Sequence, residues 1–167
     1  MAQHKAKAAP ADPKPKRDAV EVIAHNTKAY HDYLIKETVE AGLVLTGTEI
    51  KSIRAGQVNI REAYARAEKG ELWLHNMHVA QYDRGNIWNH PPTRTRKLLL
   101  HRAQIRDLLR QTKSTGMTLV PVKLYIARDR AKIELAIAQG KKIYDKRQAM
   151  AEREADRDIA RAIRSRR

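Results

Sequence analysis

Val120-Pro-Val-Lys-Leu-Tyr-Ile126 and Ile133-Glu-Leu-Ala-Ile137 are the two stretches that decide the fold of this chain. In both stretches apolar side chains recur at every second position, which is typical of half-buried β-strands. Pro121 cannot donate a hydrogen bond to a neighbouring strand, so we expect it at a sheet edge or at a bulge. The two stretches therefore predict a fold built mainly from strands.

The same alternation appears elsewhere in the chain. A third strand is predicted with four side chains on one face: Trp73, His75, Met77 and Val79. Lys69-Gly70 precedes it and predicts a hairpin turn, with residues 63–68 as the partner strand. The remaining strand candidates are residues 20–24, 30–35 and 42–45.

Two segments predict helices. Thr46 and Glu49 have the spacing of a capping box, and Gly56 suits a left-handed C-terminal cap, so a short helix is expected between them. A longer helix is expected from His101 to Gly116, because residues 105, 108, 109 and 112 follow the i, i+3, i+4, i+7 spacing. About six short strands with two interposed helices predict a small barrel with helical plugs.

The charge of the chain points to a polyanionic partner. Its 34 Lys and Arg against 19 Asp and Glu give a net charge of +15, and residues 20–138 alone hold 19 basic and 12 acidic side chains. A folded body that is itself basic favours nucleic acid as the partner. An anionic membrane surface is the alternative, but no segment approaches 18 uninterrupted apolar residues.

Composition also excludes several kinds of chemistry. The chain has no cysteine, which excludes disulfides, thiolate metal sites and a cysteine nucleophile. Residues 1–17 contain no apolar run of the secretory kind, so a cytoplasmic location is expected. No serine stands in a G-x-S-x-G elbow, and there is no glycine-rich phosphate loop.

Histidines and carboxylates give only weak indications of an enzyme. His75 and His78 would point to opposite faces of a strand and could not share a metal ion. Glu37, Glu40 and Glu49 lie close in sequence and could serve a metal-dependent nuclease, but structural charge on a strand and a helix cap explains them better. We expect no catalytic residues, no metal and no cofactor.

Three basic patches favour RNA binding. Thr93-Arg-Thr-Arg-Lys97 places three cations where a loop runs into a strand, and Lys51 and Arg54 can face one partner from the short helix. Residues 140–147 add four cations and a tyrosine that can stack on a base. Each patch alone is more often a solvated face, but three in a chain of this charge favour a binding function.

The chain divides into three parts by composition. Residues 1–19 contain three prolines among lysines and predict a disordered basic arm, residues 20–138 form the expected domain, and residues 139–167 form a basic tail. The tail is rich in helix formers but has only a thin apolar seam: Ala151, Ala155, Ile159 and Ile163. Such a segment can form a helix only on a partner that completes it. On composition alone, a solvated and frayed terminus is the more common outcome for a tail of this kind.

Four motifs in order resemble the SmpB family of SsrA-binding proteins: residues 42–56, Asn59-Ile60, residues 92–101 and residues 140–147. The resemblance implies a closed antiparallel barrel with an OB-like core, two to three flanking helices and a basic C-terminal tail. It implies a non-enzymatic adaptor of trans-translation that binds the tRNA-like domain of transfer-messenger RNA and delivers it to stalled bacterial ribosomes. The expected partners are that RNA, the ribosome through its small-subunit rRNA, and elongation factor Tu with GTP through the RNA complex. A structural ribosomal protein is the alternative.

Site residues follow partly from charge and partly from the resemblance. The RNA-binding set is expected to comprise Glu40, Lys51, Arg54, Arg94, Arg96, Lys97, Leu99 and His101. Of these, the resemblance supplies Glu40, Leu99 and His101, and family members often have Asn at the position of His101. The resemblance also implies a tail set for the decoding centre and the empty mRNA channel: Gly140, Lys141, Lys142, Tyr144, Asp145, Lys146, Arg147, Ile159, Ala162 and Ile163. The chain is expected to act as a monomer without a membrane partner.

Overall fold

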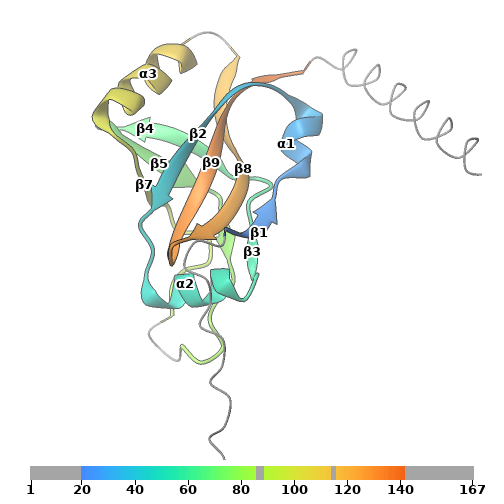
Figure 1. The fold of residues 1–167 in the computed structure, drawn as a ribbon, viewed down its shortest axis with the longest axis vertical. Coiled ribbons are helices and arrows are strands. Elements are labelled where there is room, and N and C mark those ends of the chain that lie inside the picture. Colours follow the sequence, from blue (N-terminus) through green and yellow to red (C-terminus); the bar gives the residue numbers. More distant parts are fainter. Residues whose placement is uncertain (1–19, 86–88, 114–115, 142–167) are drawn as a thin grey trace, which may run out of the picture.

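The computed structural model describes residues 20–85, 89–113 and 116–141 (Figure 1). Within these ranges the strands are β1 (Glu21–His25), β2 (Tyr33–Leu43), β3 (Val58–Asn59), β4 (Tyr64–Glu68), β5 (Glu71–His75), β6 (His78–Val79), β7 (Arg96–Leu99), β8 (Met117–Ala127) and β9 (Arg130–Gly140). The helices are α1 (Thr27–Asp32), α2 (Gly47–Arg54) and α3 (Arg102–Thr112). The fold is mainly β, as the alternating stretches predict.

Antiparallel pairing joins six of the described strands into a ring. The order runs β8, β4, β5, β7, β2, β9, and β9 pairs back onto β8. β1 is added outside the ring on β8, and β3 pairs with β6 as a separate two-stranded sheet. Helices α2 and α3 lie at opposite ends of the ring (Figure 1).

The two stretches that decide the fold form its longest hairpin. β8 and β9 are joined at Arg128-Asp129, where both residues have positive φ, as a type I′ turn requires. Ile133, Leu135 and Ile137 are fully buried in the main core, as their alternation predicts. The β8–β9 hairpin therefore contributes a large part of the main hydrophobic core.

β8 differs from the simple alternation because of a bulge. Val120 and Val122 pack in a second apolar cluster, whereas Leu124 and Ile126 belong to the main core. The register shifts between Pro121 and Lys123, which inserts one extra residue and moves the following side chains to the other face. The bulge confirms the prediction made from the proline.

The second cluster lies under α1, a helix that the sequence did not predict. Residues 30–35 were expected to be one strand, but residues 27–32 form α1 and the strand begins at Tyr33. Asn26 caps the helix, because its side chain accepts a hydrogen bond from the Ala29 backbone N–H at 3.0 Å. Ala29 then packs into the second cluster.

The predicted shared face of residues 73–79 is wrong. Leu72 and Leu74 are fully buried in β5, while Trp73 and His75 are only partly buried. Asn76 has a φ of 57°, a left-handed conformation that ends the strand and reverses the alternation. Met77 and Val79 are fully buried beyond it. The predicted hairpin with β4 is confirmed, with Glu68 paired to Glu71 across Lys69-Gly70.

Both predicted helices are present. Thr46 and Glu49 form the capping box of α2, and Gly56, with a φ of 73°, follows its C-terminus. α3 begins after His101 but ends at Thr112, earlier than Gly116. β9 continues two residues past the domain end expected at 138. No helix in the described ranges is long and apolar enough to cross a membrane.

Candidate RNA-binding surface

A shallow depression brings together the three residues expected to support RNA recognition. Glu40 comes from β2, Leu99 from β7 and His101 from the start of α3, and all three line the same hollow. Gly42, Leu100 and Gln104 complete its wall. Residues from distant parts of the chain meet here because β2 pairs with β7.

A glycine is required at the floor of this depression. Gly42 is paired with Leu99 in the β2–β7 ladder. A Cβ added at Gly42 would lie 3.3 Å from the Leu99 Cβ, which is tighter than ordinary packing. The absence of a side chain at Gly42 lets Leu99 stand on the strand with 52% of its surface exposed.

Glu40 is held as a carboxylate at the edge of the depression. The Tyr125 hydroxyl donates a hydrogen bond to one carboxylate oxygen of Glu40, and the Lys132 ammonium donates to the other. These two hydrogen bonds, that of Lys132 foremost, lower the pKa of Glu40. Burial, followed by the hydrogen bond to Glu40, raises the pKa of Tyr125. Glu40 can therefore accept hydrogen bonds from an RNA hydroxyl or amino group while Tyr125 stays protonated.

His101 is the N-cap residue of α3 and is exposed at the other side of the depression. Its backbone N–H donates to the Gln104 side-chain oxygen at 3.1 Å. This hydrogen bond joins the N-cap residue to the first turn of α3. Either a histidine or an asparagine at position 101 could face the same hollow.

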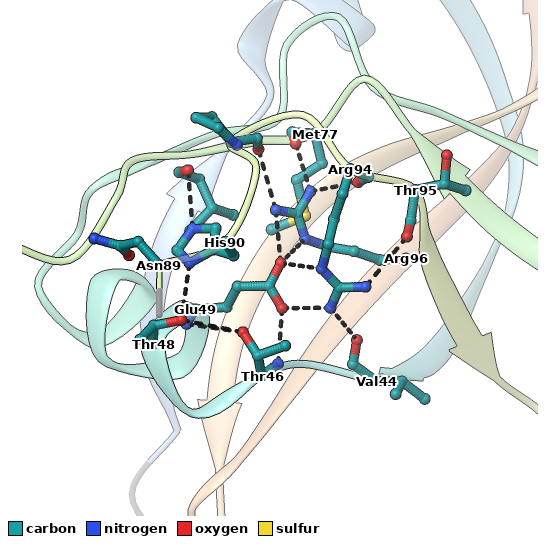
Figure 2. Close-up of polar contacts among 12 residues, drawn as sticks. Val44, Thr46, Thr48, Glu49, Met77, Asn89, His90, Arg94, Thr95 and Arg96 are labelled. Atoms are coloured by element: carbon teal, nitrogen blue, oxygen red, sulfur yellow. Dashed lines mark hydrogen bonds and ion pairs between the residues drawn. The ribbon is translucent and has the colours of Figure 1, made fainter. Parts of the chain in front are cut away.

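Arg96 occupies a different position from the one expected. Its side chain is fully buried and lies beside Glu49, 2.9 Å away (Figure 2). It also donates to the backbone oxygens of Met77 at 2.6 Å and Pro92 at 3.1 Å. The expectation that Arg96 contacts phosphate is corrected, because every side of this guanidinium faces protein.

Arg94 belongs to the same network. Its guanidinium donates to both carboxylate oxygens of Glu49, at 2.7 and 2.5 Å, and to the Val44 backbone oxygen at 3.3 Å (Figure 2). About 29% of the Arg94 side chain is exposed, so part of it remains available to a ligand. The bidentate pairing is the strong geometry for a guanidinium and a carboxylate.

Glu49 is the centre of this network. Burial alone would raise the pKa of Glu49, but hydrogen bonds from Arg94 and the Thr46 backbone, with the charges of Arg96 and Arg94, lower it to about 2. Burial lowers the pKa of Arg96, and Glu49 opposes that effect. The carboxylate thus joins the start of α2 to the loop that enters β7. It positions the strand that carries Lys97 and Leu99.

The other predicted cations are divided between β7 and α2. Lys97 is on the outer face of β7 and pairs with Glu71. On α2, Lys51 lies over the Tyr82 ring, with 5.3 Å from its ammonium to the ring centroid, and Arg54 pairs with Asp129 at 3.3 Å. The α2 cations therefore do not share a surface with the depression near α3 (Figure 1).

Of the tail set, only Gly140 and Lys141 lie within the described residues. Gly140 ends β9 opposite Tyr33. The Lys141 backbone N–H donates to the Asp32 backbone oxygen at 3.0 Å, and its ammonium donates to the Tyr30 backbone oxygen at 3.1 Å. The remaining tail residues, Lys142, Tyr144, Asp145, Lys146, Arg147, Ile159, Ala162 and Ile163, lie outside the described residues.

Sequence reasoning missed the residues that support the depression. Gly42, Gln104, Tyr125 and Lys132 come from four different elements. Only Gly42 had a usable signal, since a glycine inside a strand marks a close approach. In the described part of the chain no group of three metal-ligating side chains is present, and Glu40 and Glu49 have separate partners.

The ring of antiparallel strands, the basic charge and the exposed depression define a class: small basic β-proteins that bind nucleic acid. The model of the SmpB protein family matches residues 23–165, and the chain belongs to that family.

Curated relatives and a solved structure agree with this assignment. An SsrA-binding protein of Geobacillus kaustophilus is 61% identical over 87% of this chain and 94% of its own length. One of Bacillus cytotoxicus is 59% identical over the same shares. A solved structure described as "tmRNA-SmpB: a journey to the center of the bacterial ribosome" matches with a TM-score of 0.63 and 48% identity, over 74% of this chain and 86% of that one.

Proposed function

We propose that this chain is an RNA-binding adaptor of trans-translation. It binds the tRNA-like domain of transfer-messenger RNA and brings that RNA to stalled ribosomes. The observation that carries the proposal is the convergence of Glu40, Leu99 and His101 in one exposed depression. Family membership supports the same RNA as the partner, because the relatives are SsrA-binding proteins.

Recognition in this proposal depends on shape. An exposed leucine beside a carboxylate and an imidazole can seat an unstacked base or a sugar edge, as in proteins that read RNA loops. Lys97 and the exposed part of Arg94 would contact phosphates near the depression. Arg96 does not contact the RNA. It acts as a positioning residue, because its ion pair with Glu49 holds β7 in place. No bond chemistry is required of the protein.

The finer features belong to the same proposal. The ring of strands is an OB-like barrel, a common carrier of oligonucleotide binding. Residues 139–167 enter the empty mRNA channel, with Ala162-Ile163 as an apolar pair near the end of the tail. Elongation factor Tu with GTP joins through the RNA, and the protein acts as a cytoplasmic monomer.

A binding titration tests the proposal. Labelled tRNA-like domain and an ordinary tRNA are titrated with the full chain at several salt concentrations. We expect tighter binding to the tRNA-like domain and an affinity that falls steeply with salt, because counterions are released. Equal affinity for both RNAs would overturn the proposal, and a salt-independent affinity would overturn the phosphate contacts.

Variants in the depression locate the interaction. Leu99→Ala and His101→Ala should each weaken binding by roughly tenfold, as interface anchors do, while His101→Asn should retain it. Leu34→Ala is the matched control, since Leu34 is similarly exposed at 55% and lies at the far end of β2. Equal losses for Leu34 and Leu99 would show that the depression has no special role.

Truncation tests the role of the tail. The chain should end after Lys141, because Lys141 still bonds to α1 through its backbone. We expect this variant to keep its RNA affinity and to lose ribosome rescue. An equal loss of RNA affinity would show that the tail is part of the RNA site.

A further inference from the structure

A basic groove lies beside the depression and shares Leu99 and Leu100 with it. It runs between the turn that joins β4 to β5 and the exposed side of α3, and it encloses about 640 Å³. Its apolar floor includes Leu109 of α3. The groove is therefore a continuation of the same surface on the other side of β7.

Cations line this groove on both walls. Lys69 stands at the hairpin turn, Lys97 on β7, and Arg102 and Arg106 on α3. Arg102 and Arg106 are four residues apart, so they lie one above the other on a single helix face. Among the described residues, Glu71 is the one carboxylate lining the groove, and it is paired with Lys97.

Three of these cations have no counter-charge in the part of the chain that the structure describes. Within those residues, Lys69, Arg102 and Arg106 have no ion pair within 4 Å and no side-chain hydrogen bond. All three are exposed. By contrast, Arg54, Lys28 and Lys132 each face a carboxylate. Unpaired cations gathered on two facing walls create a local positive potential that attracts a polyanion.

We propose that this groove binds the sugar–phosphate backbone of the same RNA that contacts the depression. The proposal rests on the proposed function and extends its surface. Lys69 from the β4–β5 turn, Lys97 from β7, and Arg102 and Arg106 from α3 neutralise phosphates on either side of the nucleotide seated at Leu99. Arginine side chains in line along a helix match successive phosphates, and they position the RNA without reading its sequence.

A double substitution tests the groove. Arg102→Gln with Arg106→Gln removes two cations from exposed sites and should leave the thermal unfolding unchanged. Affinity for the tRNA-like domain should fall by roughly tenfold, and the slope of log affinity against log salt should decrease by roughly 1 to 2, about one for each phosphate that is no longer neutralised. Arg102→Lys with Arg106→Lys should retain most of the affinity.

The matched control removes the same charge elsewhere. Arg61→Gln with Arg130→Gln also takes two exposed arginines without an ion pair in the described ranges, but outside the groove. The proposal that the groove binds RNA would be overturned if the groove variant kept the affinity and the salt slope of the unaltered chain. It would also be overturned if the control variant lost as much affinity as the groove variant. These outcomes differ from failure of the proposed function, in which the unaltered chain itself does not prefer the tRNA-like domain.

Discussion

The buried network around Glu49 gives the sharpest stability prediction. Glu49→Gln keeps the shape of the side chain but removes the charge that faces Arg96, whose side chain is fully buried. Removing one partner of a buried ion pair leaves an uncompensated charge, which costs about 3–5 kcal/mol. The lowered pKa of Glu49 reflects the same interactions. Each pKa unit corresponds to about 1.4 kcal/mol, so a fall from 4.5 to about 2 corresponds to about 3 kcal/mol.

The pH dependence has a definite sign. The pKa of Glu49 is lowered by folding, so its contribution is complete above about pH 4.5 and is lost as the pH falls towards 2. The difference in unfolding free energy between the unaltered chain and Glu49→Gln should therefore be about 3 kcal/mol at pH 7. It should shrink steadily below about pH 4.5.

Urea unfolding at several pH values is the assay, with thermal unfolding as a check. A loss of about 3 kcal/mol corresponds to a fall in Tm of roughly 6–12 °C for a chain of this size. Glu62→Gln is the control, because Glu62 pairs with Lys28 on the surface and should cost less than about 1 kcal/mol. Adding Arg96→Met to Glu49→Gln should recover part of the loss, since the unpaired charge is then gone.

Two results would refute this reasoning. One is a Glu49→Gln variant as stable as the Glu62→Gln control at pH 7. The other is a difference in unfolding free energy that stays constant from pH 7 to pH 2, which would show that the charge of Glu49 contributes nothing.

Three further predictions concern single side chains. Asn26→Ala should lower the unfolding free energy by about 1–3 kcal/mol in urea, because the buried amide bonds the Ala29 N–H and the Pro121 oxygen; a neutral result would contradict this role. Tyr125→Phe should raise the pKa of Glu40 in an NMR titration, since the carboxylate then accepts one hydrogen bond fewer, and an unchanged pKa would show that Tyr125 is not its partner. Asn76 has a φ of 57°, so Asn76→Gly should be neutral or stabilising in thermal unfolding, while Asn76→Val should destabilise by at least ~1 kcal/mol. The reverse order of stability would contradict the left-handed conformation.

Local pattern was enough to predict the strands β8 and β9, the β4–β5 hairpin and the helices α2 and α3. Alternation in β8 and β9, the Lys69-Gly70 turn and the Thr46 capping box each depend on a few neighbouring residues. The errors occur where the backbone departs from regular geometry. The bulge after Pro121 and the left-handed Asn76 each reverse the alternation, and α1 is too short to show a period.

The site was predictable only in part, because its assembly depends on distant pairing. The family resemblance indicated Glu40, Leu99 and His101, but only the β2–β7 ladder explains why they meet. Charge in the sequence did not separate the buried Arg96 from the outward Lys97, although they are adjacent on one strand. Because side chains alternate on β7, Arg96 points inward and Lys97 points outward. The carboxylate of Glu49 compensates the buried charge of Arg96.

Photo-crosslinking from position 99 tests the central claim most directly. A photoreactive amino acid replaces Leu99 in the full chain, and the matched control carries it at Leu34, which has nearly the same exposure. We predict an RNA crosslink from position 99 that maps to the tRNA-like domain of transfer-messenger RNA and is suppressed by unlabelled RNA of the same kind. Crosslinking from position 99 no stronger than that from position 34 would contradict the account.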